Sequence, residues 1–277
     1  MKKGYRRLGT VFILFTIVIS FLIWGNRSIV TSEYTLSSPA LPAAYNGLRV
    51  VQVSDLHNNS FGKGNRRLLR AIEEANPDLI FLTGDLLDSR RTDSETALEF
   101  VREAAKIAPI YYVVGNHEGR IPEDYLPLET EMEKLGVTVL RNRSVRLERE
   151  GQTIHIAGID DPSFFPSQVE FLKTLQELCA DDGYTLLLSH HPELLDAYAE
   201  VGAELVFSGH AHGGQIRLPW IGGLFAPHQG AFPVYDAGIF TKDDTCLIVS
   251  RGLGNSLFPL RVFNRPELVV VELNTKP

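Results

Sequence analysis

Cysteine is scarce in this sequence: its 277 residues include only Cys179 and Cys246. Two cysteines exclude a disulfide framework, and by themselves they cannot build a thiolate zinc site. We expect two buried free thiols rather than one disulfide. The composition is otherwise that of an ordinary globular protein, with 44% hydrophobic and 22% charged residues. The length suits one large domain, or at most two.

Basic residues are sparse after the first thirty positions. Five of the 27 Lys and Arg residues lie in residues 1–30, which leaves 22 against 34 Asp and Glu, a formal charge of about −12. A general nucleic-acid binder needs a basic face that neutralises phosphates. We therefore expect no nucleic-acid partner, and an anionic substrate would need positive charge from another source.

Acidic residues are absent before Glu33, and the same region holds a long apolar run. Lys2, Lys3, Arg6 and Arg7 precede TVFILFTIVISFLIWG, which is just long enough to span a bilayer. Because a basic flank stays on the cytoplasmic side, the rest of the chain would lie across the membrane. Residues 1–30 are thus predicted to be a basic flank and a single-pass anchor, with the remaining chain extracytoplasmic.

A cleaved signal peptide followed by export is the alternative for this segment. No A-x-A-like cleavage site follows Trp24 closely, and PALPA at 39–43 lies far downstream, so we favour the uncleaved anchor. The twin arginine of YRRLG also matches, loosely, an export signal for folded proteins.

The remaining chain divides into two parts of unequal length. Residues 31–46 are polar and contain proline, which indicates a linker or an edge segment, and we expect 47–277 to form the main folded domain. Strands are predicted at 48–55, 78–85 and 108–118, alternating with helices at 64–76, which stops before Pro77, 96–107 and 128–136. This alternation predicts an α/β layered core.

The second half of the chain favours a mixed sheet over a purely parallel one. Alternating runs around Glu150 and Gly151 predict a β-hairpin. Helices are predicted at 167–180 and 192–202, with strands at 184–190, 203–210, 245–252 and 267–274, and no helix separates the last two strands.

Five apolar runs end in side chains that can bind metal. The runs end in SDLH, TGDLLD, VGNHE, SHH and SGHAH. Ligands collect at the carboxyl ends of strands in layered α/β proteins. One such residue is more often a cap or a turn residue, but five concurrent cases favour a site. The candidate ligands are Asp55, His57, Asp85, Asn116, His190, His210 and His212.

Seven candidates are too many for one ion and suit two, provided that one carboxylate bridges them. Oxygen and nitrogen donors without thiolate suit manganese, iron or zinc. Two such ions roughly 3.5–4 Å apart can hold the attacking and leaving oxygens of an in-line displacement, and water between them is hydroxide-like near neutral pH. The cations would also supply the positive field that the acidic domain lacks.

The blocks DLH, GDLLD, GNHE, SHHP and GHAHGGQ, in this order, resemble the calcineurin-like metallophosphoesterase superfamily. The N-terminal anchor, GHAHGGQIRLPWIGG and SRGLGNSLFPLRVFNRPEL resemble its bacterial membrane-associated branch of YkuE- and YaeI-type phosphodiesterases. The resemblance covers about residues 48–272. It implies a four-layer α/β/β/α sandwich of two mixed sheets.

The resemblance also implies roles for individual residues. One metal takes Asp55, His57, Asp85 and His212, and the second takes Asp85, Asn116, His190 and His210, so that Asp85 bridges. His117 is implied to face the leaving-group oxygen as a general acid or transition-state donor. Asp88 is implied to orient His117.

The remaining histidines and Glu118 are expected to have structural roles. We expect His155 to be a strand residue, His191 a surface residue or a neighbour behind a ligand, and His228 an ordinary loop residue rather than a substrate contact. Glu118 is expected to brace its loop.

Two classes of function remain. The first is a phosphoesterase that cleaves a phosphodiester, pyrophosphate or phosphomonoester, and the second is a metal-binding module without catalysis. Because every ligand position is filled, we favour the enzyme. Apolar loops at 216–233 and 252–263, each with one formal charge, suggest an amphiphilic substrate such as a phospholipid or a nucleotide-linked diacylglucosamine. The alternative is that these loops merely fold over the core.

Overall fold

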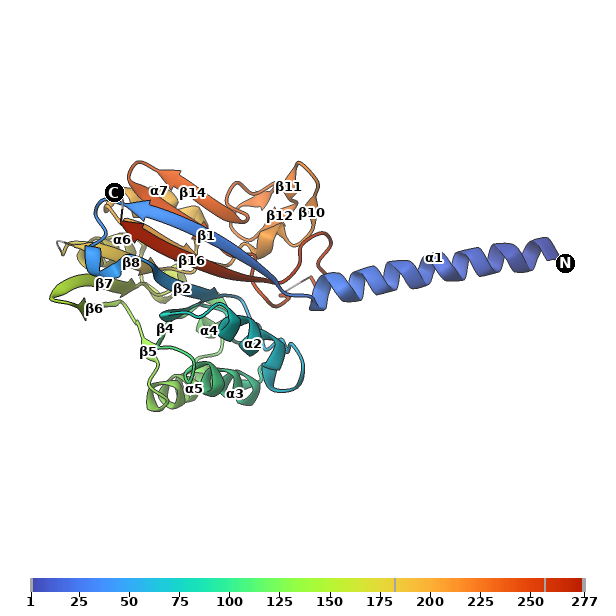
Figure 1. The fold of residues 1–277 in the computed structure, drawn as a ribbon, viewed down its shortest axis with the longest axis horizontal. Helices are drawn as coiled ribbons and strands as arrows, with labels where there is room; N and C mark the ends of the chain where they lie inside the picture. The colour runs from blue at the N-terminus through green and yellow to red at the C-terminus, as the bar shows by residue number, and fades with distance from the viewer. Residues whose placement is uncertain (1, 182, 257, 276–277) are drawn as a thin grey trace.

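The computed structural model describes residues 2–181, 183–256 and 258–275. Two six-stranded sheets face each other, and a long N-terminal helix, α1 (Lys2–Arg27), extends away from them (Figure 1). Most apolar side chains of α1 are exposed, and its segment Leu8–Arg27 is long and apolar enough to cross a membrane, with a mean hydropathy of 2.3.

The first sheet has the strand order β1-β16-β2-β3-β4-β5. Strands β2 to β5 run parallel, and β16 is antiparallel to β2 and parallel to β1. The bounds are β1 (Val30–Ser38), β2 (Leu48–Val53), β3 (Leu79–Thr83), β4 (Ile110–Val113), β5 (Thr138–Val139) and β16 (Glu267–Thr275).

The second sheet has the order β14-β15-β9-β8-β7-β6 and is also mixed. Its two edge pairs are antiparallel, whereas β15, β9, β8 and β7 are parallel. The bounds are β6 (Arg143–Arg149), β7 (Gln152–Gly158), β8 (Tyr184–Leu188), β9 (Leu205–Ser208), β14 (Gly238–Lys242) and β15 (Thr245–Val249). Arg149 pairs with Gln152 across Glu150 and Gly151, which confirms the predicted hairpin.

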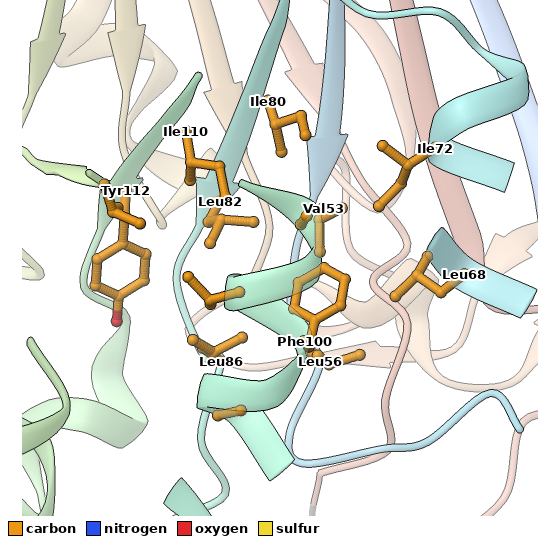
Figure 2. Packing of buried hydrophobic residues seen from close by; sticks show 14 of the residues in the cluster. Val53, Leu56, Leu68, Ile72, Ile80, Leu82, Leu86, Phe100, Ile110 and Tyr112 are labelled. Carbon is orange, nitrogen blue, oxygen red and sulfur yellow. The ribbon is translucent and has the colours of Figure 1, made fainter. Parts of the chain in front are cut away.

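Three hydrophobic cores separate four layers, as predicted. One core lies between the first sheet and α2 (Arg66–Glu74), α3 (Ser94–Ala104) and α5 (Pro122–Lys134). Phe100 of α3 packs there among Val53, Leu56 and Leu86 (Figure 2). The second core joins the two sheets, and the third covers the second sheet with α6 (Gln168–Leu178) and α7 (Leu195–Glu200).

Residues 31–46 belong to the folded domain and are not a linker to it. Residues 30–38 form the edge strand β1, whose register with β16 runs from Val30 opposite Glu267 to Ser38 opposite Thr275. Alternate residues of β1 are half-buried, and Tyr34 and Leu36 pack against the core between the sheets. The short 3-10 helix η1 (Ala43–Tyr45) follows and buries Tyr45.

Short elements connect the strands near their carboxyl ends. Helix α4 (Asn116–Gly119) follows β4, and two small hairpins, β10 (Arg217–Leu218) with β11 (Gly222–Gly223) and β12 (Phe225–Ala226) with β13 (Gly230–Ala231), follow β9. The other 3-10 helices are η2 (Lys63–Asn65), η3 (Pro162–Phe164), η4 (Pro192–Leu194) and η5 (His212–Gly214).

Candidate metal centre

Strand topology places the candidate ligands at one edge of the sandwich. Strands β2, β3 and β4 are parallel neighbours, so the residues that follow them, Asp55, Asp85 and Asn116, emerge at the same edge. Strands β8 and β9 of the facing sheet are parallel neighbours as well, and the histidines follow their ends. The carboxyl ends of two sheets therefore meet where the metal-binding side chains lie.

The backbone that carries these side chains is strained. Of the seven candidate ligands, Asp55, His57, Asp85, His210 and His212 all have φ between 48° and 64°, in the left-handed region. Left-handed backbone at residues other than glycine costs free energy and is concentrated at functional sites. The turns therefore place these five side chains through a backbone conformation that a loop without a functional constraint would rarely adopt.

Two glycines make room for the carboxylates. A Cβ atom at Gly209 would lie 2.3 Å from Asp55 Oδ2, and one at Gly115 would lie 2.3 Å from Asp85 Oδ1. Both distances are shorter than any real Cβ contact, so another residue at either position would displace a carboxylate.

Asp55, His57, Asp85 and His212 form the first cluster of donor atoms, all within 4.8 Å of one another. The Nε2 atom of His57 lies 3.6 Å from Asp85 Oδ2 and 3.2 Å from His212 Nε2. The Nε2 atom of His212 lies 3.3 Å from Asp55 Oδ1. All four side chains are buried.

Asp85, His190 and His210 form the second cluster, within the same 4.8 Å limit, so that Asp85 belongs to both. The Nε2 atom of His190 lies 3.3 Å from Asp85 Oδ2. Asn116 is held beside this cluster, because the next residue, His117, donates its backbone N–H to Asp85 Oδ1 over 2.8 Å. The structure thus brings the seven predicted residues to one place.

Hydrogen bonds from the protein orient the ligand atoms. The Nδ1 atom of His190 lies 2.7 Å from the carbonyl oxygen of Thr83, to which it can only donate, and its Nε2 atom, the nitrogen left for a metal, faces Asp85. Ser54 Oγ donates to Asp55 Oδ2 over 2.6 Å, and the backbone N–H of His210 donates to both oxygens of Asp55. Such outer contacts are typical of metal-binding histidines and carboxylates.

Burial decides the charges of the cluster. Burial lowers the pKa of His57 and of His212 to about 3, and it lowers that of His210 well below its usual value. Burial alone would also lower the pKa of His190, but the carboxylates of Asp85 and Asp55 raise it well above its usual value. Burial raises the pKa of Asp55, whereas His190 overcomes burial and holds the pKa of Asp85 well below its usual value.

The donor set fits two divalent cations. The Nε2 atom of His190 and the Oδ1 atom of Asn116 are buried without a hydrogen-bond partner, and a buried polar atom without a partner is costly. Metal ligands must be deprotonated, and the neutral imidazoles of His57, His210 and His212 meet this requirement. Nitrogen and carboxylate oxygen without sulfur suit manganese, iron or zinc.

His117 lies next to the first cluster, with its ring centroid 4.5 Å from that of His57. Its Nδ1 atom accepts the backbone N–H of Ser89 over 3.0 Å, so the neutral ring carries its proton on Nε2. Burial lowers the pKa of His117. The ring is therefore a neutral donor through Nε2, which lies 3.2 Å from Ser256 Oγ.

Asp88, which the family resemblance implies to orient His117, lies near that histidine without a direct hydrogen bond to it. Its Oδ1 atom lies 3.7 Å from His117 Nδ1, and that nitrogen accepts its hydrogen bond from the backbone N–H of Ser89 instead. Asp88 instead accepts from the backbone N–H of Arg90 over 3.0 Å and from the Arg91 guanidinium over 3.1 Å. Asp88 thus shapes the turn that presents the Ser89 amide.

Two residues for which the sequence predicts structural roles lie as expected. Glu118 accepts the backbone N–H groups of Asp85, Leu87 and Gly115 over 2.8 to 3.0 Å and braces the turns at the ends of β3 and β4. Burial and the neighbouring Asp85 raise the pKa of Glu118 to about 7. His155 lies on β7, with Nδ1 3.6 Å from Asp181.

Arg261 is a buried cation that the sequence motifs did not assign to the site. It is 1% exposed, donates to the carbonyl oxygen of Arg251 over 2.7 Å and places Nη2 3.4 Å from His212 Nδ1. Burial lowers its pKa to about 10. The sequence feature that could have drawn attention to Arg261 is that it is the one charged residue in the segment 252–263.

His191 and His228 also lie close to the metal-binding residues. His191 is buried behind His210, with 4.2 Å between the ring centroids, and it contacts Asp161 and Glu193. His228 is not an ordinary loop residue, because its Nδ1 atom lies 2.9 Å from His210 Nε2.

Comparison with known proteins agrees with this arrangement. The sequence profile of the calcineurin-like phosphoesterase family matches residues 48–214, more than half of the chain, and the chain belongs to that family. It is 32% identical over 252 residues to the metallophosphoesterase YkuE of Bacillus subtilis strain 168, covering 88% of this chain and 85% of YkuE.

One further relative and one solved structure extend the comparison. A transmembrane protein with a metallophosphoesterase domain from Danio rerio is 28% identical over 84% of this chain, and the match spans about half (54%) of that relative. The structure of TT1561 from Thermus thermophilus covers 75% of this chain and 91% of that one, with a TM-score of 0.51 at 14% identity, which shows a shared fold. The protein is thus a metallophosphoesterase, a hydrolase of phosphoesters.

Proposed function

We propose that the protein is a dinuclear metal-dependent phosphoesterase that hydrolyses a phosphodiester, pyrophosphate or phosphomonoester of a lipid. The observation that carries the proposal is the pair of donor clusters that share Asp85. Asp55, His57, Asp85 and His212 would hold one cation, and Asp85, Asn116, His190 and His210 the other. When bound, two such cations supply polarisation of the phosphoryl oxygens and a hydroxide nucleophile at neutral pH.

The chain itself supplies proton transfer and positioning. His117 is a neutral imidazole that presents its Nε2 proton, and in that state it can donate to the oxygen of the leaving group. A cavity of about 310 Å³ opens beside His57 and is also lined by Asn58, Arg91 and Asn255. Asp93 lines the cavity too, and Arg91 pairs with Asp88 over 3.1 Å, so an anionic substrate would depend on the bound cations for positive charge.

The site lies at the end of the domain from which α1 departs. Val30 at the start of β1 pairs with Glu267 at the start of β16, and β16 is antiparallel to β2, whose end carries Asp55. The last turn of α1 contacts the loop beside the cavity, since Asn26 Oδ1 accepts from Arg261 N over 2.8 Å and from Asn255 Nδ2 over 3.1 Å. If α1 spans a bilayer, the site opens close to its surface.

The same end of the domain exposes large apolar side chains. Gly214 of η5 packs against Gly223 of β11, which ties the hairpin loops to the turn that carries His212, and Phe263 packs on Phe21 of α1 with 5.3 Å between ring centroids. The exposed apolar residues of these loops, named here the apolar rim, are Trp220, Ile221, Phe225, Phe232, Val234, Phe258, Leu260 and Phe263. Such a rim fits the interfacial region of a bilayer.

These relationships favour a substrate that is presented by a membrane, such as a phospholipid or a nucleotide-linked diacylglucosamine. They also favour α1 as a single-pass anchor whose basic flank stays cytoplasmic, with the catalytic domain on the outer side. An alkaline phosphatase reporter fused to the C-terminus, which is active only outside the cytoplasm, should be active; an inactive but expressed reporter would contradict this topology.

The substrate proposal is tested with the full-length protein in detergent or vesicles, supplied with manganese. We expect hydrolysis of a soluble chromogenic phosphodiester by the wild type and loss of that hydrolysis in Asp85→Asn. We also expect faster turnover of phosphoesters in mixed vesicles than of short-chain soluble analogues of the same headgroup. Equal turnover of both forms would contradict the lipid substrate, and bound metal without turnover of any ester would favour a binding module.

A further inference from the structure

A separate group of donor atoms lies beside the dinuclear site, on the side of His210 that faces away from Asp85. It consists of His191, Glu193, His210 and His228, whose ligand atoms all lie within 4.8 Å of one another. His191 follows β8, Glu193 lies in η4, and His228 lies in the turn between β12 and β13. The chain after β8, His210 after β9 and the turn between β12 and β13 thus converge on one point.

The ring nitrogens of this group face one another and one carboxylate. The Nδ1 atom of His191 lies 2.6 Å from Glu193 Oε1, and the Nδ1 atom of His228 lies 3.5 Å from the same oxygen. The Nε2 atom of His210 lies 2.9 Å from His228 Nδ1. The second oxygen of Glu193 is buried without a hydrogen-bond partner. Imidazole protons can bridge these close contacts when no metal is bound, and a cation that displaces those protons would meet the same atoms.

We propose that these four residues form a third metal site, distinct from the dinuclear pair and selective for zinc. The ligands are His191 Nδ1, a carboxylate oxygen of Glu193, His228 Nδ1 and His210 Nε2. Three imidazoles and one carboxylate make a nitrogen-rich, four-ligand set of the kind that zinc takes in proteins.

Asp161 supports the ligand role of His191. It contacts Nε2 of His191, and its own Oδ1 atom accepts the backbone N–H of Ser163 over 2.8 Å, which holds the carboxylate in place. A carboxylate on one ring nitrogen fixes the histidine tautomer that presents the lone pair of the other nitrogen to a metal. His191 therefore presents Nδ1 toward Glu193 and the proposed ion.

His210 would be shared between the third site and the pair. Because its Nε2 atom faces His228, Nδ1 is the nitrogen left for the cluster of Asp85 and His190. The side chain of His228 is 59% exposed, so a cation can reach this site from solvent without passing the buried pair.

The test is the zinc content of the full-length protein in detergent, measured by mass spectrometry after equilibration with zinc and removal of the free ion. We expect three equivalents in the wild type and two in both His228→Ala and Glu193→Gln. His155→Ala, which removes a histidine from β7 away from all these residues, should keep three, and so should His117→Ala even though its activity falls. Two equivalents in the wild type, or three in both variants, would overturn the proposal.

A second measurement keeps the proposal testable if a variant fails to fold. Wild-type crystals grown with zinc should show an anomalous peak between Glu193 and His228 in data collected at the zinc edge. Crystals whose anomalous peaks lie only at Asp85 and its neighbours would overturn the third site while leaving the phosphoesterase proposal intact.

Discussion

The Nδ1 atom of His117 accepts the backbone N–H of Ser89 over 3.0 Å. A main-chain amide can only donate, so this contact assigns the ring proton of the neutral histidine to Nε2. The proton then sits on the nitrogen that lies beside Ser256 rather than on the one buried against the turn. The backbone amide of Ser89, and not a carboxylate, thus determines the tautomer of His117, the proposed general acid.

Replacing His117 should impair proton donation without loss of metal. We expect His117→Ala to lower kcat by about 10²- to 10⁴-fold, the usual contribution of a general acid. The loss should be larger for an alkyl leaving group than for nitrophenolate, because the weaker base needs less protonation. Steady-state kinetics with both esters and metal analysis check this, and an equal loss on both esters would contradict the role.

Replacing Asp88 should have a much smaller effect. Because Asp88 accepts from Arg90 and Arg91 rather than from His117, Asp88→Asn keeps a side-chain oxygen that can hold the turn. We expect a decrease in kcat of less than about tenfold, with the pH profile of kcat unchanged. A decrease as large as that in His117→Ala would show that Asp88 acts on the histidine directly.

The metal-free protein should lose stability on acidification. His57 and His212 have pKa values of about 3 in the folded state, whereas an unfolded histidine titrates near 6.5. Between these values the unfolded state binds more protons, so the free energy of unfolding falls as the pH falls, by about 1.4 kcal/mol per pH unit for each histidine. The pKa of His190 is raised, so between about pH 3 and pH 6.5 this residue is protonated in both the folded and the unfolded state and does not contribute to the slope.

Denaturant unfolding in the presence of a chelator measures this slope. His57→Gln should reduce it by about 1.4 kcal/mol per pH unit, since one of the titrating groups is removed. His155→Gln is a matched control outside the site and is expected to leave the slope unchanged. An unaltered slope in His57→Gln would show that this histidine is not held neutral by burial.

The apolar rim should matter only for substrates in a bilayer. Trp220 is fully exposed at the tip of the first small hairpin, and its indole fits the membrane interface. We expect Trp220→Ser to lower turnover of a phosphoester in vesicles several-fold and to leave turnover of a soluble diester unchanged. Val169→Ser, which alters an exposed apolar residue of α6, is the control. Equal losses on both substrates would argue against contact with the bilayer.

The sequence predicted the residues of the proposed dinuclear site because their signal is local. Asp55, Asp85 and Asn116 each follow an apolar run of their own strand, so a rule about strand ends suffices to find them, and parallel pairing brings them to one edge. The family resemblance then divided the ligands between two ions. The histidine pair at 210 and 212 follows the same logic from the facing sheet.

Other features depend on contacts that no local pattern records. Strand β1 pairs with β16 at the other end of the chain, so its alternation alone did not distinguish an edge strand from a linker. His228 lies in an irregular turn with φ of 58°, and only the folding of the small hairpins brings it to His210. The Ser89 amide that holds His117 is a backbone group, and residue types give no sign of it.

Anomalous diffraction from crystals of the full-length protein loaded with manganese tests the central claim most directly. Data collected near the manganese edge should show two peaks that flank Asp85, one beside Asp55, His57 and His212 and the other beside Asn116, His190 and His210. A single peak, or two peaks that do not both contact Asp85, would contradict a pair of cations joined by that carboxylate.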